Sequence, residues 1–271
     1  MPAHAPAEAF FLAAAPGERY CLYHAPLGTC RGALVYLHPF AEEMNKSRRM
    51  AALQARALAA AGYGVLQIDL HGCGDSDGDF GDARWEHWLA DVAAARAWLE
   101  QRVGQPAGLW GLRLGALLAL DYANSHPLPQ LVLWQPVLQG ANYLTQFLRL
   151  RLASDMLDES APAGGTKELR AQLAAGDTLE IAGYHLAPQL AARIDTLDAA
   201  SLQPACPTHW FELVAAAERP LPPAATRVAQ AWGAQEVRKV AGAPFWSTQE
   251  IAEVPALIAA TCAALTGAQH G

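Results

Sequence analysis

Two glycines, Gly111 and Gly115, enclose the short segment that most constrains how this chain can fold. The apolar run 107–110 before them predicts a buried strand, and the leucine- and alanine-rich run 116–120 after them predicts a helix. A strand that passes directly into a helix needs a sharp turn, and glycine permits the close backbone approach that such a turn requires. Arg113 stands at the centre of this turn. The sequence therefore predicts a strand, a tight turn carrying an arginine, and a helix.

Short apolar runs alternate with segments of helical period along most of the chain. Strands are predicted at 33–37, 65–69, 107–110, 131–134, 208–214 and 237–240, and helices from about 46 to 62 and from 85 to 99. This alternation predicts βαβ units in an α/β fold with a doubly wound, mainly parallel sheet. The segments 9–12 and 19–24 are expected to pair antiparallel at its edge. Functional groups in such sheets gather at the carboxyl ends of the strands.

The alternation breaks down after the strand at 131–134. Residues 140–203 mix helical stretches with Gly164, Gly165, Gly176 and Pro188. We interpret 140–203 as a cap or lid inserted into a core formed by 1–139 and 204–271.

Composition excludes several classes of partner. The formal net charge is −7 and no run of lysine or arginine occurs, so neither a nucleic acid nor an anionic membrane surface is an expected partner. No segment approaches the roughly 18 uninterrupted apolar residues of a membrane span. The N-terminus lacks the basic region and long apolar run of a secretory signal, which favours a cytoplasmic protein.

The cysteines and acidic residues do not predict a metal site. The five cysteines are scattered without a C-x-x-C pair, so neither a disulfide framework nor a zinc site is predicted. The aspartates between 75 and 82 lack the spacing and terminal glutamate of an EF-hand loop. We expect no metal and no cofactor, and a homodimer is left open.

Three loops carry a resemblance to a known superfamily. His38-Pro39-Phe40 follows a predicted strand, residues 69–76 read D-x-x-G-x-G-x-S, and 111–115 occupies the place of a G-x-S-x-G nucleophile elbow. In these loops the chain resembles the α/β-hydrolases, which include esterases, peptidases and lipases. The resemblance implies that the backbone N–H groups of Phe40 and Leu114 form an oxyanion hole.

A narrower resemblance involves three longer segments. Residues 38–49, 110–115 and 245–251 resemble the group called exosortase A system-associated hydrolase 2. That group is linked to bacterial exopolysaccharide and protein-sorting gene clusters. The resemblance implies a hydrolase.

The parts of a serine hydrolase triad do not match this sequence. Arg113 stands in place of the nucleophile, and a guanidinium stays protonated and has no lone pair for attack. The loop 241–247, where the family carries its histidine, contains none. Glu218 is the only carboxylate in the place of the acid. With two of three parts missing, the usual mechanism is not predicted.

A guanidinium at a helix N-terminus needs a negative neighbour, because the helix dipole already makes that end positive. Glu42, Glu43 and Asp75 are the expected partners within the chain. Arg113 is therefore either locked in a salt bridge within a closed pocket or available to a ligand.

Two functional hypotheses follow from these observations. In the first, the protein is a pseudo-hydrolase that binds a small anionic or acyl ligand in the old active-site cleft. A bidentate arginine contact suits such a group, and the ligand-binding residues would be Arg113, Leu114, Phe40 and His38. In the second, it hydrolyses an ester or thioester with a non-standard nucleophile or an activated water. The weak catalytic candidates for this chemistry are His71, Glu42, Glu43, His185 and Glu218.

Overall fold

A computed structural model describes residues 6–155 and 165–267 and is built around one eight-stranded sheet. Its strands are β1 (Glu8–Ala13), β2 (Glu18–His24), β3 (Gly32–Leu37), β4 (Tyr63–Ile68), β5 (Ala107–Leu112), β6 (Leu131–Trp134), β9 (Thr208–Val214) and β10 (Val237–Ala241). The spatial order is β1-β2-β4-β3-β5-β6-β9-β10. All pairs from β4 to β10 are parallel, whereas β2 pairs antiparallel with both β1 and β4. The predicted α/β class, mainly parallel sheet and antiparallel edge are confirmed.

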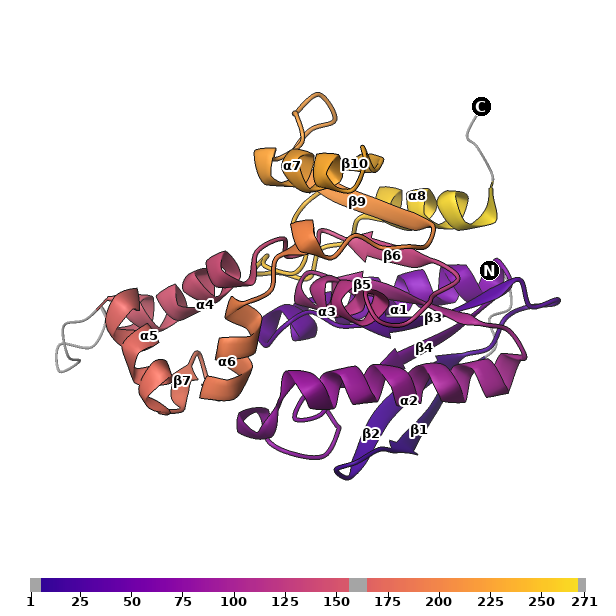
Figure 1. Cartoon of the computed structure of the whole chain (residues 1–271). Coiled ribbons are helices and arrows are strands. Elements are labelled where there is room, and N and C mark those ends of the chain that lie inside the picture. The colour runs from indigo at the N-terminus through magenta and orange to yellow at the C-terminus, as the bar shows by residue number, and fades with distance from the viewer. Residues whose placement is uncertain (1–5, 156–164, 268–271) are drawn as a thin grey trace.

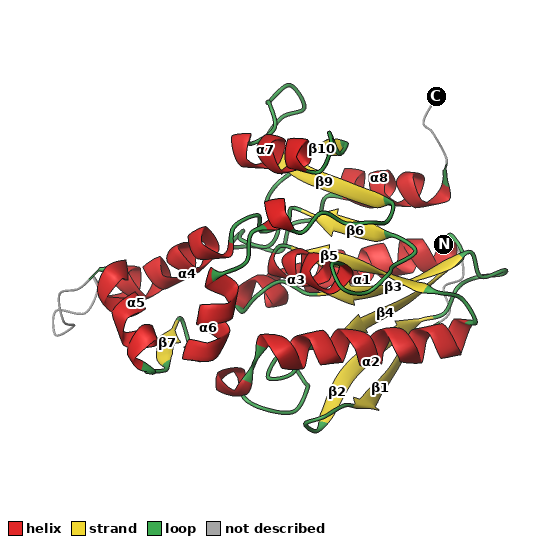
Figure 2. Ribbon diagram, in the orientation of Figure 1, coloured by secondary structure: helices red, strands yellow, loops and turns green. Residues whose placement is uncertain are grey.

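Helices cover both faces of this sheet (Figures 1 and 2). The helices of the core are α1 (Glu42–Ala60), α2 (Trp85–Val103), α3 (Leu114–Ala123), α7 (Pro223–Ala231) and α8 (Pro255–Thr266), with a short 3-10 turn η1 (Phe80–Asp82). The helix predicted from about residue 46 begins at Glu42, so that prediction was four residues late. Acidic side chains favour a helix N-terminus, and Glu42 and Glu43 form the first turn of α1.

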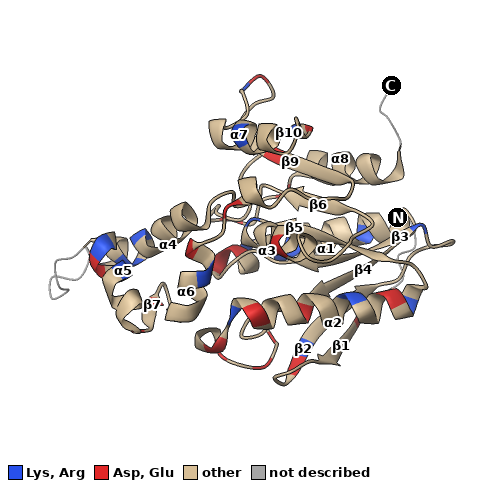
Figure 3. Ribbon diagram, viewed as in Figure 1, with Lys and Arg blue, Asp and Glu red and all other residues tan. Residues whose placement is uncertain are grey.

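The two faces of the sheet bury alternate residues of each strand. In β3, Val35 and Leu37 belong to the cluster packed against α2 and α3, whereas Leu34 and Tyr36 belong to the cluster packed against α1 and α8. Period-two alternation between two buried faces explains why the central strands are apolar throughout. Figure 3 shows that charged residues are spread mainly over the helices and loops.

The segment between β6 and β9 forms a separate group of elements. It contains α4 (Gly140–Asp155), α5 (Thr166–Ala175), the hairpin β7 (Leu179–Ile181) and β8 (Tyr184–Leu186), α6 (Pro188–Asp195) and the 3-10 turn η2 (Ala199–Ser201). Figure 1 shows α4, α5, α6 and β7 gathered at one end of the sheet. Residues 156–164 of the predicted cap lie outside the described residues.

No helix among the residues that the structure describes is both long enough and apolar enough to cross a membrane.

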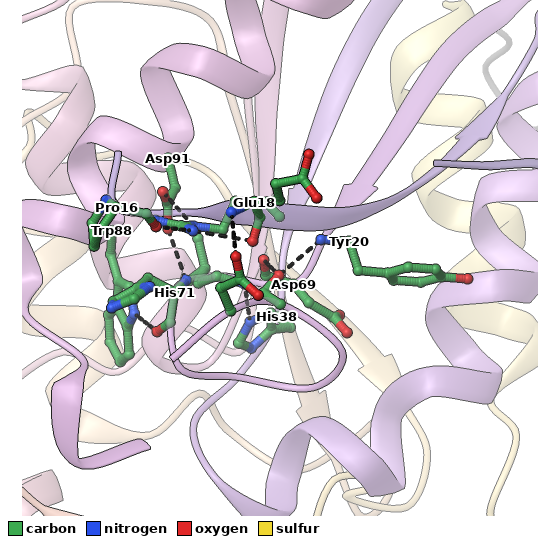
Figure 4. Close-up of polar contacts among 12 residues, drawn as sticks. Pro16, Glu18, Tyr20, His38, Asp69, His71, Trp88 and Asp91 are labelled. Atoms are coloured by element: carbon green, nitrogen blue, oxygen red, sulfur yellow. Dashed lines mark hydrogen bonds and ion pairs between the residues drawn. The ribbon is translucent and has the colours of Figure 1, made fainter. Parts of the chain in front are cut away.

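A buried ion pair joins β2, the strand next to the edge of the sheet, to α2 (Figure 4). Arg19 on β2 donates from Nε to Asp91 Oδ1 at 2.7 Å, and both side chains are 0% exposed. The other oxygen of Asp91 accepts the backbone N–H of His71 at 2.8 Å, and Trp88 donates to the His71 carbonyl at 3.0 Å. A guanidinium Nη of Arg19 also donates to the Pro16 carbonyl at 2.7 Å. Three segments distant in the chain (16–19, the loop at His71 and α2) are thus joined around two charges.

We predict that Asp91→Ala destabilises the protein by about 3–5 kcal/mol, because it leaves the Arg19 charge buried without its partner. The matched control is Glu8→Ala, which breaks the exposed pair that Glu8 makes with Arg102 at 3.0 Å. That control variant should lower the free energy of unfolding by less than about 1 kcal/mol. Urea unfolding of both variants measures the difference, and equal losses would contradict this assignment.

Candidate ligand site at the elbow

The turn between β5 and α3 has the sharp geometry that the sequence predicts. Arg113 has φ 55° and ψ −117°, a backbone conformation that residues other than glycine rarely adopt. Helix α3 begins at the next residue. Its backbone N–H donates to the Trp134 carbonyl at 3.0 Å, which ties the turn to the end of β6. The predicted strand, turn and helix are therefore present.

Both positions of the turn require glycine, because other backbone atoms lie too close to leave room for a Cβ atom. A Cβ on Gly115 would lie 2.3 Å from the Leu37 carbonyl oxygen at the end of β3. A Cβ on Gly111 would lie 2.4 Å from the Cα of Ala116 in the first turn of α3. Neither contact involves a side chain that can move aside, so larger residues would displace the backbone.

Arg113 is held by Glu43 and by two aromatic rings. Its Nε lies 3.4 Å from Glu43 Oε1, and the two side chains are 17% and 21% exposed. The guanidinium carbon lies 5.7 Å from the Tyr143 ring centroid and 5.2 Å from that of Trp246, distances typical of cation–π contacts. Of the three carboxylates expected as partners, Glu43 forms the ion pair.

Glu43 also connects the elbow to the inserted segment. Its second oxygen accepts a hydrogen bond from the Tyr143 hydroxyl of α4 at 3.1 Å. Burial raises the pKa of the Glu43 carboxyl, while the Arg113 charge and the Tyr143 hydroxyl lower it. Helices α1 and α4 and the turn between β5 and α3 thus meet at one carboxylate.

A second carboxylate near Arg113, Glu212, was missed by sequence reasoning. It lies inside β9, is 2% exposed, and accepts a hydrogen bond from the Trp210 indole at 2.8 Å. Burial raises the pKa of Glu212 to about 7, against the lowering effects of Trp210, the Arg113 charge and Gln135. Only the presence of a glutamate between the apolar residues Phe211 and Leu213 of a predicted strand could have indicated it.

The residues implied to form an oxyanion hole are closely packed. The Phe40 ring makes edge-to-face contacts with Phe80, Trp88, Tyr143 and Phe147. The free space beside Phe40 and Leu114 is about 10 Å³, which at most suffices for one water molecule. A ligand-binding role for these two residues stays a prediction.

Both ring nitrogens of His38 contact backbone groups of neighbouring loops. Its ring Nδ1 lies 2.8 Å from the Pro39 carbonyl, and its Nε2 accepts the Leu70 N–H at 3.1 Å. Burial lowers the pKa of His38, so the neutral ring can serve both contacts. His38 therefore supports the loop, and neither ring nitrogen is left for the predicted ligand.

An open cleft reaches Arg113 from the side of α4. It has a volume of about 330 Å³, within the range of small-molecule sites. Its wall combines the Arg113 side chain with the chain after β6, α4 and the start of α7 (Pro136, Val137, Leu138, Gln139, Asn142, Tyr143, Gln146, Pro222 and Ala224). A ligand can therefore approach Arg113 without entering the packed region around Phe40.

The other catalytic candidates do not gather around Arg113. Glu42 accepts hydrogen bonds from Asn45 and from the Tyr184 hydroxyl. His185 and Glu218 are exposed, and Glu218 makes no hydrogen bond or ion pair with any described residue. The structure brings only Glu43 from this group to the elbow.

His71 is buried in the loop after β4, where its backbone joins the Asp91 network. Its ring packs edge-on against His87 at a centroid distance of 5.1 Å. Burial and the nearby positive charge of Arg19 lower the pKa of His71. Within the described ranges, no group of three or more His, Cys, Asp or Glu side chains is placed to hold a metal ion.

Comparison with known proteins gives a family and a fold. Residues 28–199 match the family profile described as serine aminopeptidase, S33. Human protein ABHD12B is 34% identical over 111 residues, which are 41% of this chain and 29% of that protein. The matched part thus spans less than a third of that relative.

Solved structures of low sequence identity share the fold. Est1E from Butyrivibrio proteoclasticus with bound ferulic acid aligns with a TM-score of 0.70 and 14% identity, covering 96% of this chain and 97% of that one. The α/β-hydrolase GrgF from Penicillium sp. sh18 aligns with a TM-score of 0.66 and 15% identity, covering 97% and 99%. At these identities the likeness concerns the fold alone.

We predict that Glu212 makes stability depend on pH. Its folded pKa of about 7 lies above its usual value of 4.5, so the folded state holds this proton more tightly. Its stabilising contribution is present below about pH 4.5 and is lost as pH rises through 7, a change of about 3 kcal/mol. Glu212→Gln keeps the acceptor for Trp210 and should remove this dependence.

Urea unfolding between pH 4.5 and 8 measures the effect, with Glu218→Gln as the exposed control. Superimposable pH profiles for the wild type and Glu212→Gln would contradict the assignment.

Proposed function

Because the chain belongs to the serine aminopeptidase S33 family and has the α/β-hydrolase fold, we propose that it is a pseudo-hydrolase that binds a small ligand. The observation that carries this proposal is Arg113 itself, fixed at the elbow and paired with Glu43. A family member that acts through an acyl-enzyme needs a nucleophile here and a histidine within hydrogen-bond reach. Arg113 supplies no nucleophile, and the corresponding loop places Trp246 against the guanidinium.

The proposed ligand carries a carboxylate or an acyl carbonyl. Arg113 uses Nε for Glu43, whereas its two Nη groups make no hydrogen bond within residues 6–155 and 165–267. Two parallel N–H groups suit a carboxylate or a carbonyl oxygen. Since Glu43 offsets the positive charge, a ligand with one negative charge or none fits better than a polyanion. The amides of Gln139, Asn142 and Gln146 in the cleft wall offer further polar contacts.

We also propose that residues 140–203 act as a cap over this cleft. The Tyr143 hydroxyl donates a hydrogen bond to Glu43, and the Tyr184 hydroxyl donates one to Glu42. Two tyrosines of the insertion therefore contact consecutive glutamates of α1. On resemblance alone, we assign the protein to the exosortase A system-associated group and to the bacterial cytoplasm.

The alternative is an ester or thioester hydrolase that activates water. Glu43 favours it, because burial raises its pKa towards the range of a general base. Against it, both Glu43 oxygens are engaged, one by Arg113 and the other by Tyr143.

Arg113→Ser tests whether a serine hydroxyl at the elbow is enough to give ester hydrolysis. We predict that this variant folds and hydrolyses neither short nor long acyl esters, because none of the histidines that the structure describes contacts residue 113, where it could accept the serine proton. Assays with p-nitrophenyl acetate and p-nitrophenyl decanoate measure turnover. Ester hydrolysis by this variant above the wild-type level would show that a base is present and would contradict the proposal.

Arg113→Ala tests whether the Arg113 side chain binds a carboxylate ligand. We expect the wild type to bind hexanoate or benzoate and the variant to bind it about tenfold to a hundredfold more weakly, the effect of losing charge-assisted hydrogen bonds. Ligand-observed NMR titration measures both affinities, and Arg219→Ala on an exposed loop is the control. Equal affinity of the wild type and Arg113→Ala would refute the role of Arg113.

A further inference from the structure

A second cavity lies on the other side of the sheet from α2. It has a volume of about 560 Å³ and lies between α1 and the strands β2, β3 and β4. It shares no lining residue with the Arg113 cleft. Its size falls in the range of small-molecule sites.

The cavity arises from an unusual pairing of helix and sheet surfaces. On α1, Ala51 and Ala52 face it, and their short side chains leave the space unfilled. On the sheet, Tyr20, Tyr36 and Gln67 face it from three different strands. A sheet face covered by a helix is ordinarily apolar, so polar side chains in this place need a reason.

Tyr36 is the most informative of these residues. It is 4% exposed, and its ring packs on Trp110 with centroids 4.3 Å apart. Its hydroxyl makes no hydrogen bond with any described residue, although it lines the cavity. Burial raises the pKa of this hydroxyl, so it is a neutral donor and acceptor. Because this hydroxyl opens onto the cavity, a molecule bound there can hydrogen-bond with it.

The charges around the cavity disfavour an anion. Arg48 pairs with Asp69 through two contacts, Nη1 to Oδ1 at 3.3 Å and Nη2 to Oδ2 at 2.9 Å. The backbone N–H of Asp75 donates to the same carboxylate at 3.1 Å, and the exposed Asp75 side chain adds a negative charge at the wall. The one guanidinium in the wall is therefore already neutralised.

The Gln67 amide and the tyrosine hydroxyls supply the polar groups on the sheet side of the cavity. The Gln67 carbonyl oxygen lies 3.2 Å from His24 Nε2, and burial keeps that histidine neutral by lowering its pKa. The Gln67 amide N–H groups and the Tyr36 hydroxyl are left to contact oxygen atoms of a ligand. The rings of Tyr20 and Tyr36 add flat apolar surface on which a ring can pack.

We propose that this cavity binds an uncharged cyclic polyol, from one to two rings in size. Its hydroxyl oxygens accept hydrogen bonds from Tyr36 and Gln67, and its ring packs against the tyrosine side chains. The site is independent of Arg113 and of the proposed pseudo-hydrolase function.

Titration with myo-inositol, D-glucose and maltose, followed by saturation-transfer NMR, tests this proposal. We expect at least one of them to bind, and glucuronate, which adds a negative charge, to bind at least fivefold more weakly than glucose. Tyr36→Phe removes one hydroxyl from a buried ring and should weaken binding about fivefold, as expected for one neutral hydrogen bond.

Two controls separate this site from the elbow. Arg113→Ala should bind the polyol with unchanged affinity, whereas Ala52→Trp, which fills the cavity, should abolish binding. The proposal is overturned if none of the three polyols binds, if glucuronate binds as tightly as glucose, or if Tyr36→Phe and Ala52→Trp bind like the wild type. Loss of polyol binding in Arg113→Ala would instead place the ligand at the elbow and would equally overturn it.

Discussion

The backbone turn at Arg113 is the constraint on which the rest of the structure depends. At this point the central strand β5 passes directly into α3, and the backbone adopts a positive φ of 55°. The turn is possible because Gly115 lets α3 approach within contact of β3, and because Gly111 lets the strand approach the first turn of that helix. A backbone this strained persists only where its surroundings hold it in place. The sheet therefore holds the Arg113 side chain at a fixed point at its carboxyl edge.

A cation at that point determines what surrounds it. The helix N-terminus is already positive, so Arg113 needs a counter-charge, and Glu43 on α1 supplies it. Tyr143 on α4 contacts both partners of the pair, which connects the inserted segment to the core. Trp246 lies against the guanidinium on the loop where a hydrolase of this fold would carry its histidine. We interpret the elbow as a retained scaffold that positions a guanidinium for a ligand, in place of a nucleophile.

Sequence reasoning predicted the sheet and the elbow but only part of the site. The strands were recognisable because each is a short apolar run, and the elbow because two glycines four residues apart separate a strand from a helix. Glu43 was one of three predicted partners, and only the start of α1 at Glu42 decides that Glu43 reaches Arg113. The proximity of Glu212 to Arg113 and the packing around Phe40 could not be predicted, since they join segments distant in the chain: β9 with the elbow, and α4 with the loop after β3. His38 was predicted to contact a ligand, whereas the backbone of Pro39 and Leu70 engages its ring.

The central claim is that this protein has the α/β-hydrolase fold without a serine nucleophile. Intact-protein mass spectrometry after treatment with a fluorophosphonate tests this claim most directly. The wild-type protein should show no mass increase, while a serine hydrolase of the same fold treated in parallel is labelled completely. Stoichiometric labelling of any serine in the native protein, lost on unfolding before treatment, would contradict the account.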